Sequence, residues 1–195
     1  GTNLWTDGFI GTKDDTLRWR RIHVHNRAFE NFVYAGIEAY ASLMQEKDIM
    51  LKANLRKVAM EDFAFAKHRF DSLGFKDISS IGGGGDHAAM ASNSQYMANI
   101  SFAASMIYKL TGDAYYANEA ANAIRYTVSC QRTEPLKDKD KLRGFFYRDQ
   151  DKKSIVHYTH QSRDQVYMQA LTMLCETQPN HADYNKWKES IRLYG

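Results

Sequence analysis

Five side chains that can transfer protons or donate hydrogen bonds occupy eight consecutive positions of this 195-residue chain: His157, Tyr158, His160, Arg163 and Asp164. Imidazole, phenol and carboxyl groups are the usual general acids and bases, and a guanidinium binds anionic or polar substrate groups. A polar loop between two helices does not need such a set of titratable side chains to reverse the chain direction. The segment therefore indicates either the rim of a catalytic site or the polar start of a helix, and the pattern leaves both open.

Two similar groups occur earlier in the chain. His25 and Asn26 stand before one helical pattern, and Asp86 and His87 follow a run of glycines before another. Of the 7 histidines in the chain, these segments hold five: His23, His25, His87, His157 and His160. Such clustering before predicted helices is the strongest functional signal in the sequence.

The elements that must position these groups are helices. Apolar residues recur at spacings of three and four, and the only prolines, Pro135 and Pro179, fall between helical patterns. The patterns predict helices over residues 26–45, 48–74, 86–112, 114–131, 162–178 and 182–194, after an irregular segment over residues 1–22. Within them, Phe29, Phe32, Ile37, Tyr40 and Met44, and then Leu51, Val58 and Phe63, are expected to face the core.

The spacing of the predicted helices favours a single all-α domain, an array of three helical hairpins. Short turns join the helices within each hairpin, whereas long connections over residues 78–85 and 132–159 precede the third and fifth helices. A short β-hairpin is expected within the second connection, around Phe145–Tyr147 and Ile155–Tyr158. The long connections should lie at one end of the array, which is where a rigid scaffold usually carries its site.

Two stretches resemble a known family. "YKLTGDAYYANEAANAIRY" resembles the Thr-Gly-Asp hairpin of the six-hairpin glycosidase superfamily, and the stretch from "GFFYRDQ" to "IRLYG" is similar to family 9-like glycoside hydrolases of Bacteroidetes. The resemblance covers residues 86–195 and implies an (α/α)6 toroid, or half of one, with a funnel lined by the starts of its inner helices. The chain lacks the Asp-Ala-Gly-Asp signature of family 9 cellulases. It is expected to be part of a longer catalytic domain, or to associate with a second copy that covers its inner helices.

That resemblance implies hydrolysis of a polysaccharide or oligosaccharide. The reaction needs one carboxylic acid to protonate the leaving oxygen and a second carboxylate as nucleophile or base. Asp86 and Asp164 are the predicted pair, although Asp86 could instead cap a helix and Asp164 could instead stabilise a helix dipole. The residues predicted to bind substrate are His25, Asn26, His87, Tyr147, His157, Tyr158, His160 and Arg163.

Two other functions stay open at this point. A polysaccharide lyase would use Tyr158 or His160 as its base and acid, with Asn26 and Arg163 neutralising the uronate carboxylate. A non-catalytic helical array would bind a glycan or a protein through its open inner face. No cofactor or metal is predicted, because His157 and His160 lack a third ligand and the glycine run lacks the Lys and Ser/Thr of a phosphate-binding loop.

The composition of the chain limits the classes of partner that it is expected to bind. The 26 basic residues are interleaved with 23 acidic ones for a net charge of +3, which argues against a nucleic-acid-binding face. No apolar run is long enough to span a bilayer. Cys130 and Cys175 are expected to be free thiols. Since the sequence starts at Gly1 without a Met, a removed leader and a secreted or periplasmic location are expected.

Overall fold

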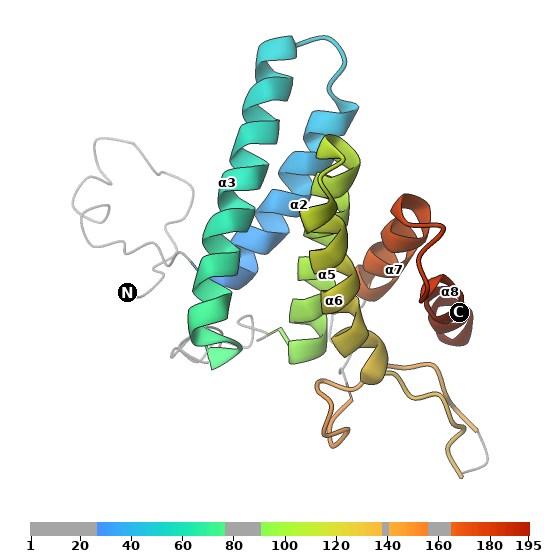
Figure 1. Cartoon of the computed structure of the whole chain (residues 1–195). Coiled ribbons are helices and arrows are strands. Elements are labelled where there is room, and N and C mark those ends of the chain that lie inside the picture. The colour runs from blue at the N-terminus through green and yellow to red at the C-terminus, as the bar shows by residue number, and fades with distance from the viewer. Residues whose placement is uncertain (1–26, 77–90, 138–140, 156–164) are drawn as a thin grey trace, which may run out of the picture.

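The computed structural model describes residues 27–76, 91–137, 141–155 and 165–195. Six helices lie in these ranges (Figure 1): α2 (Ala28–Met44), α3 (Ile49–Leu73), α5 (Asn93–Thr111), α6 (Ala114–Ser129), α7 (Gln165–Thr177) and α8 (Tyr184–Tyr194). The prediction of an all-helical chain is therefore confirmed for the described residues. The β contacts in these ranges are isolated bridges, which join Gln131 to Phe146 and Tyr147 to Ile155.

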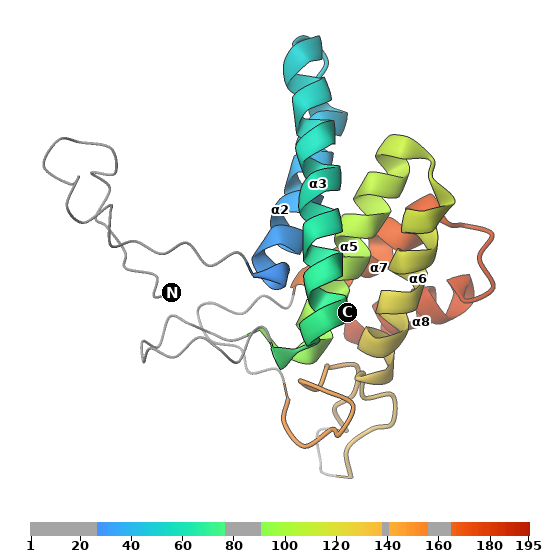
Figure 2. The same cartoon turned by 60° about the vertical axis from the view of Figure 1, so that its left-hand side comes forward.

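The helices form three consecutive hairpins, α2–α3, α5–α6 and α7–α8. The first helices of the hairpins lie side by side, with α5 between α2 and α7, and each second helix packs on its own first helix (Figures 1 and 2). The result is a row of three inner helices backed by three outer ones.

Local chemistry explains most of the helix ends. Asp48 and Asp113 cap α3 and α6 by accepting hydrogen bonds from the backbone N–H groups of Leu51 and Tyr115. Gly112 ends α5 in the left-handed region, at φ 73°, where a residue without Cβ is favoured.

The start of the third predicted helix needs correction. Helix α5 begins at Asn93 rather than at Asp86, because Ser92 and Gln95 form a reciprocal capping box around its first turn. Ala91 and Ser92 are not helical. Ser92 is therefore the N-cap of α5 and the predicted helix start at Asp86 is wrong, while Asp86 itself lies outside the described residues.

Small residues allow the inner helices to approach closely. Ala98, Ser101 and Ala103 on α5 are fully buried. A Cβ added to Gly36 on α2 would lie 2.9 Å from Cδ1 of Phe102 on α5. Edge-to-face contacts between Phe32 and both Phe63 and Tyr96 fill the space between α2, α3 and α5.

The predicted core of the first hairpin is partly wrong. Phe29, Phe32 and Phe63 are buried as expected, but five predicted core side chains are exposed: Ile37, Tyr40, Met44, Leu51 and Val58. Periodicity marks which residues share a helix face, yet it does not show whether another element covers that face. The α2–α3 hairpin consequently presents apolar side chains to solvent.

The cysteines are free, as predicted. Cys130 is buried at the end of α6, and burial raises the pKa of its thiol to about 11. Cys175 on α7 is half-buried, and burial raises its pKa as well. None of the helices in the described ranges is long and apolar enough to cross a bilayer.

Candidate functional site

The N-terminal ends of the three inner helices meet at one end of the molecule. Phe29 in the first turn of α2 contacts Tyr96 of α5, with ring centroids 5.3 Å apart. The hydroxyl of Tyr167 in the first turn of α7 lies 2.8 Å from Oγ of Ser94 at the start of α5. The helix starts that follow the three predicted groups of chemical residues are therefore adjacent, as the sequence indicated.

A buried polar network holds this junction together. Ser94 Oγ donates a hydrogen bond to the carbonyl of Tyr147 at 2.8 Å, so the Tyr167 hydroxyl is left to donate to Ser94. The backbone N–H of Ser94 donates to the carbonyl of Arg148, and Oγ of Thr127 on α6 donates to the carbonyl of Ser94. Such fully paired buried groups fix the ends of α5, α6 and α7 in one arrangement.

A pocket of about 470 Å³ opens beside this junction, between α2, α5 and α7. It is lined by Phe29, Glu30, Val33, Tyr34, Asn99, Gln165, Val166 and Gln169. Amides and a carboxylate alternate there with aromatic and aliphatic side chains. This combination suits a ligand with hydroxyl groups and apolar faces, such as a sugar.

Among the described residues that line the pocket, Glu30 is the one acidic residue. Its Oε1 lies 3.6 Å from Nη1 of Arg27, whose side chain is buried at the start of α2. A buried guanidinium needs a nearby anion to offset its lost hydration, and Glu30 supplies it. Glu30 Oε2 is buried without a hydrogen-bond partner in the described part of the chain. A ligand hydroxyl in the pocket could donate to that oxygen.

The amides of the pocket come from the two other inner helices. Asn99 on α5 donates its Nδ2 to the carbonyl of Gln95 at 3.0 Å, and its oxygen has no hydrogen-bond partner among the described residues. Gln165 and Gln169 lie one turn apart at the start of α7, and both are exposed. Ligand hydroxyls can both donate to such amides and accept from them.

Tyr147 is the one predicted site residue within the described ranges. It is half-buried in the connection after α6, its backbone N–H donates to the carbonyl of Cys130, and its ring contacts that of Phe145 at 5.3 Å. Phe146 between them is buried and stacks on Tyr167 at 4.1 Å. Tyr147 therefore lies near the start of α5, but it does not line the pocket.

The other predicted site residues lie outside the described residues: His25, Asn26, Asp86, His87, His157, Tyr158, His160, Arg163 and Asp164. The proposed separation of the Asp86 and Asp164 carboxyl groups is therefore still a prediction. Residues 156–158 of the expected β-hairpin lie outside as well. Of its described residues, Tyr147 and Ile155 form an isolated bridge with each other, and Phe146 forms one with Gln131.

Sequence reasoning missed the residues that line the pocket. Glu30, Tyr34, Asn99 and Gln169 look like ordinary solvent-facing positions of amphipathic helices. A usable signal was the stripe Glu30–Tyr34, one turn apart, on the face of α2 opposite the buried Phe32 and Ala35. Within the described residues, no group of three or more His, Cys, Asp or Glu side chains could hold a metal ion.

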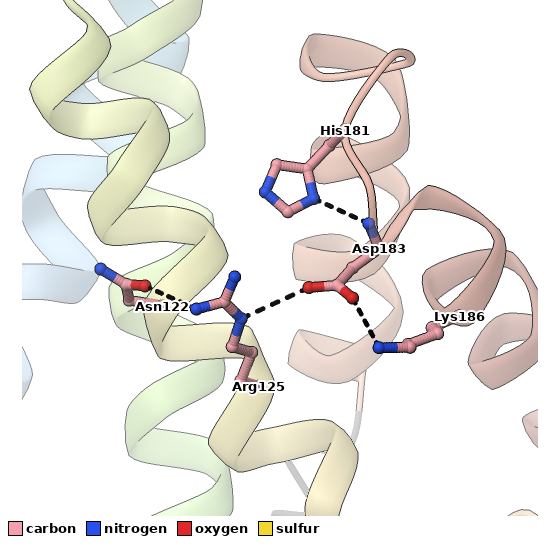
Figure 3. Close-up of polar contacts among 5 residues, drawn as sticks. All are labelled: Asn122, Arg125, His181, Asp183 and Lys186. Atoms are coloured by element: carbon pink, nitrogen blue, oxygen red, sulfur yellow. Dashed lines mark hydrogen bonds and ion pairs between the residues drawn. The ribbon is translucent and has the colours of Figure 1, made fainter.

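A second polar cluster joins α6 to the α7–α8 turn (Figure 3). Asp183 accepts from Arg125 Nε at 3.3 Å and from Lys186 Nζ at 2.7 Å, and these cations lower the pKa of its carboxyl group. The backbone N–H of Asp183 donates to Nδ1 of His181. The His181 ring stacks on that of Trp187, with centroids 4.6 Å apart. Each of these contacts is internal, so the cluster fastens the third hairpin to the second.

Glu38 on α2 and Asp62 on α3 form a pair of carboxylates that has no ion-pair partner in the described part of the chain. Burial raises the pKa of Glu38 on α2, and the Asp62 carboxylate on α3 raises it further. Burial, followed by the charge of Glu61, raises the pKa of Asp62. A raised carboxyl pKa means that the folded protein binds protons more tightly than the unfolded chain, so stability falls as the pH rises through the folded-state values.

We therefore expect Glu38→Gln to raise the free energy of unfolding of dilute protein at pH 7 by about 0.5 kcal/mol, the size of a removed like-charge contact. This gain in stability should vanish below the ordinary Glu pKa of 4.5, where residue 38 is neutral in the wild type as well as in the variant. Urea unfolding at pH 4 and at pH 7 measures it, with the exposed Glu46→Gln as control. An equal gain at both pH values would contradict the electrostatic cause.

Comparisons of the chain with protein-family models, curated proteins and solved structures find no match.

Proposed function

We propose that this chain carries the catalytic end of a glycoside hydrolase that cleaves polysaccharide or oligosaccharide, on three hairpins arranged as half of an (α/α)6 toroid. The observation that carries the proposal is the pocket where the N-terminal ends of α2, α5 and α7 meet. The row of inner helices backed by outer ones supports the toroid, since alternate helices of a toroid occupy those two layers.

Chain connectivity links the pocket to the predicted residues. Asp164 immediately precedes Gln165, which lines the pocket, and Asn26 immediately precedes Arg27, whose guanidinium pairs with Glu30. Asp86 precedes α5 by seven positions, within the connection that leads to Ser92. The segments that hold the proposed catalytic pair thus lead directly into two of the three helices that form the pocket.

The proposed mechanism divides the work among these residues. Asp86 and Asp164 act as the acid and as the nucleophile or base on opposite sides of the glycosidic bond. Glu30 accepts hydrogen bonds from sugar hydroxyls, and the amides of Asn99, Gln165 and Gln169 fix the orientation of the ring. Phe145 and Tyr147 offer aromatic faces to a further sugar unit at the rim of the site.

The test is hydrolysis of a panel of polysaccharides by the chain and by Asp86→Asn and Asp164→Asn. Each substitution keeps the shape of the side chain and removes its ionisable group, so we expect reducing-end release to fall by about a hundredfold or more. Asp151→Asn, in the exposed turn after Tyr147, is the matched control and should retain full activity. Circular dichroism verifies that all three variants fold.

Two results would overturn the proposal of a glycoside hydrolase. Retained cleavage in both Asp variants, with an unsaturated product that absorbs in the near ultraviolet and is lost in Tyr158→Phe, would indicate a lyase. Binding of a glycan without turnover would indicate a non-catalytic module.

A further inference from the structure

The first hairpin ends the array with an unusual surface, here named the α2–α3 flank. It consists of Glu38 on α2 and of Leu51, Val58, Asp62 and Phe65 on α3. Leu51, Val58 and Phe65 repeat every seven residues, and Asp62 lies one turn from Val58 and from Phe65. Helical residues at these spacings share one face, so the acidic pair is set within an apolar stripe.

The exposed apolar side chains and the unpaired carboxylates of the α2–α3 flank are features of a protein–protein interface. Leu51 is 43%, Val58 38% and Phe65 41% exposed, although all three are large and apolar. Between them, Glu38 Oε2 is buried with no hydrogen-bond partner, and neither Glu38 nor Asp62 has an ion-pair partner in the ranges that the structure describes. Partly desolvated carboxylates without a cation destabilise a free surface, and a partner that brings a cation relieves that cost.

The opposite end of the array carries the matching charge. A surface of the α7–α8 hairpin, here named the α7–α8 face, consists of the exposed Lys188 and of four half-buried residues: Met168 and Cys175 on α7 and Tyr184 and Ile191 on α8. The apolar members are only partly buried. The Lys188 ammonium lies over the ring of Tyr184, 5.6 Å from its centroid, and has no carboxylate partner among the described residues. Burial raises the pKa of the Cys175 thiol and the nearby Lys188 charge acts in the opposite direction, which places Lys188 next to α7.

We propose that the α2–α3 flank docks on the α7–α8 face of a second copy of this chain. In that contact Lys188 of the second copy lies against Glu38 and Asp62, while Leu51, Val58 and Phe65 pack on Met168 and Cys175. The inner helix α7 of one copy then lies beside the inner helix α2 of the next, as α5 does within the chain. The contact is head to tail, so it either closes on itself or continues into longer assemblies.

Sedimentation velocity of the full chain across the micromolar range tests the proposal. Wild-type protein should associate as its concentration rises, whether the assembly stops at a dimer or continues. Glu38→Lys/Asp62→Lys and Lys188→Glu should each weaken association by about tenfold or more, because every contact needs one of each face. The loop variants Glu134→Lys and Lys137→Glu change the net charge in the same two directions outside both faces and should have no effect.

An equimolar mixture of the two reversed variants gives the sharpest test. In either variant alone, the flank and the face carry like charges and repel. In the mixture, the basic flank of one variant meets the acidic face of the other, and the unchanged flank and face also meet, so association should return. Should the reversed flank fail to fold, Glu38→Gln/Asp62→Asn removes the charges with little change of shape and should still weaken association. A wild-type chain that stays monomeric throughout, or a Lys188→Glu variant that associates as well as wild type, would overturn the proposal. Neither result depends on whether the chain hydrolyses a glycan.

Discussion

Gly144→Ala should lower the free energy of unfolding by about 3 to 5 kcal/mol, the sum of a strained left-handed residue and an overpacked contact. Gly144 is buried with a φ of 91°, a region that residues with a Cβ rarely adopt. An added Cβ would lie 1.7 Å from the carbonyl oxygen of Leu193 in the last turn of α8. No rotamer change relieves a clash between a Cβ and a backbone oxygen, so the connection after α6 would have to separate from α8.

Gly112→Ala provides the matched control. Gly112 also has a positive φ, of 73°, but an added Cβ there would meet no atom of the described residues within 4 Å. Gly112→Ala should therefore lower the free energy of unfolding only by the cost of a left-handed alanine, about 1 to 2 kcal/mol. Urea unfolding followed by circular dichroism measures both variants, and their difference isolates the contact with Leu193. Equal losses would show that the close approach to α8 does not contribute.

The hairpins could be predicted because their signals are local. Gly112 and Asp113 stand side by side in the sequence and act on residues within four positions of themselves, which is why the α5–α6 turn is correct. The start of α5 was missed, although Ser92 and Gln95 have capping-box spacing. The apolar and alanine-rich residues before Ser92 favour a helix by propensity, and propensity does not show where a helix begins.

The candidate site was predictable in position rather than in composition. Placing the long connections at one end follows from hairpin topology, and the contact between Ser94 and Tyr167 agrees with it. Which polar side chains face the pocket depends on how α2, α5 and α7 are rotated against one another. The sequence around Glu30 and Asn99 does not reveal that rotation. A polar helix face that lines a pocket and one that faces bulk water have the same sequence pattern.

Packing of the connection after α6 was likewise not predictable, because its anchors are distant in sequence. Gln131 reaches a residue 59 positions away on α8. Phe146 stacks on Tyr167, and that contact holds the neighbouring Tyr147 near the start of α5. The geometry at the proposed rim of the site therefore depends on a few long-range contacts that no local pattern encodes.

Gln131→Leu should be the second most damaging substitution, with an expected loss of about 3 kcal/mol. The Gln131 side chain is buried at the end of α6, and its Nε2 donates to the carbonyls of Gly144 at 2.8 Å and Ser190 at 2.9 Å. Its Oε1 accepts from Oγ of Ser190 at 2.7 Å. Leucine has a similar volume but leaves these buried polar groups unpaired, and each costs about 1 to 3 kcal/mol, partly relieved by local rearrangement.

Two further variants separate lost hydrogen bonds from lost packing. Ser190→Ala removes one of the partners that Gln131→Leu leaves unpaired, so the double variant should lose at least about 0.5 kcal/mol less than the sum of the single losses. Gln150→Leu, an exposed glutamine whose side chain donates to Ser129, should cost less than about 0.5 kcal/mol. Strictly additive losses for Gln131 and Ser190 would contradict the hydrogen-bond account. Because the same amide holds the segment that leads to Tyr147, Gln131→Leu should also weaken any glycan binding at the rim more than Gln150→Leu does.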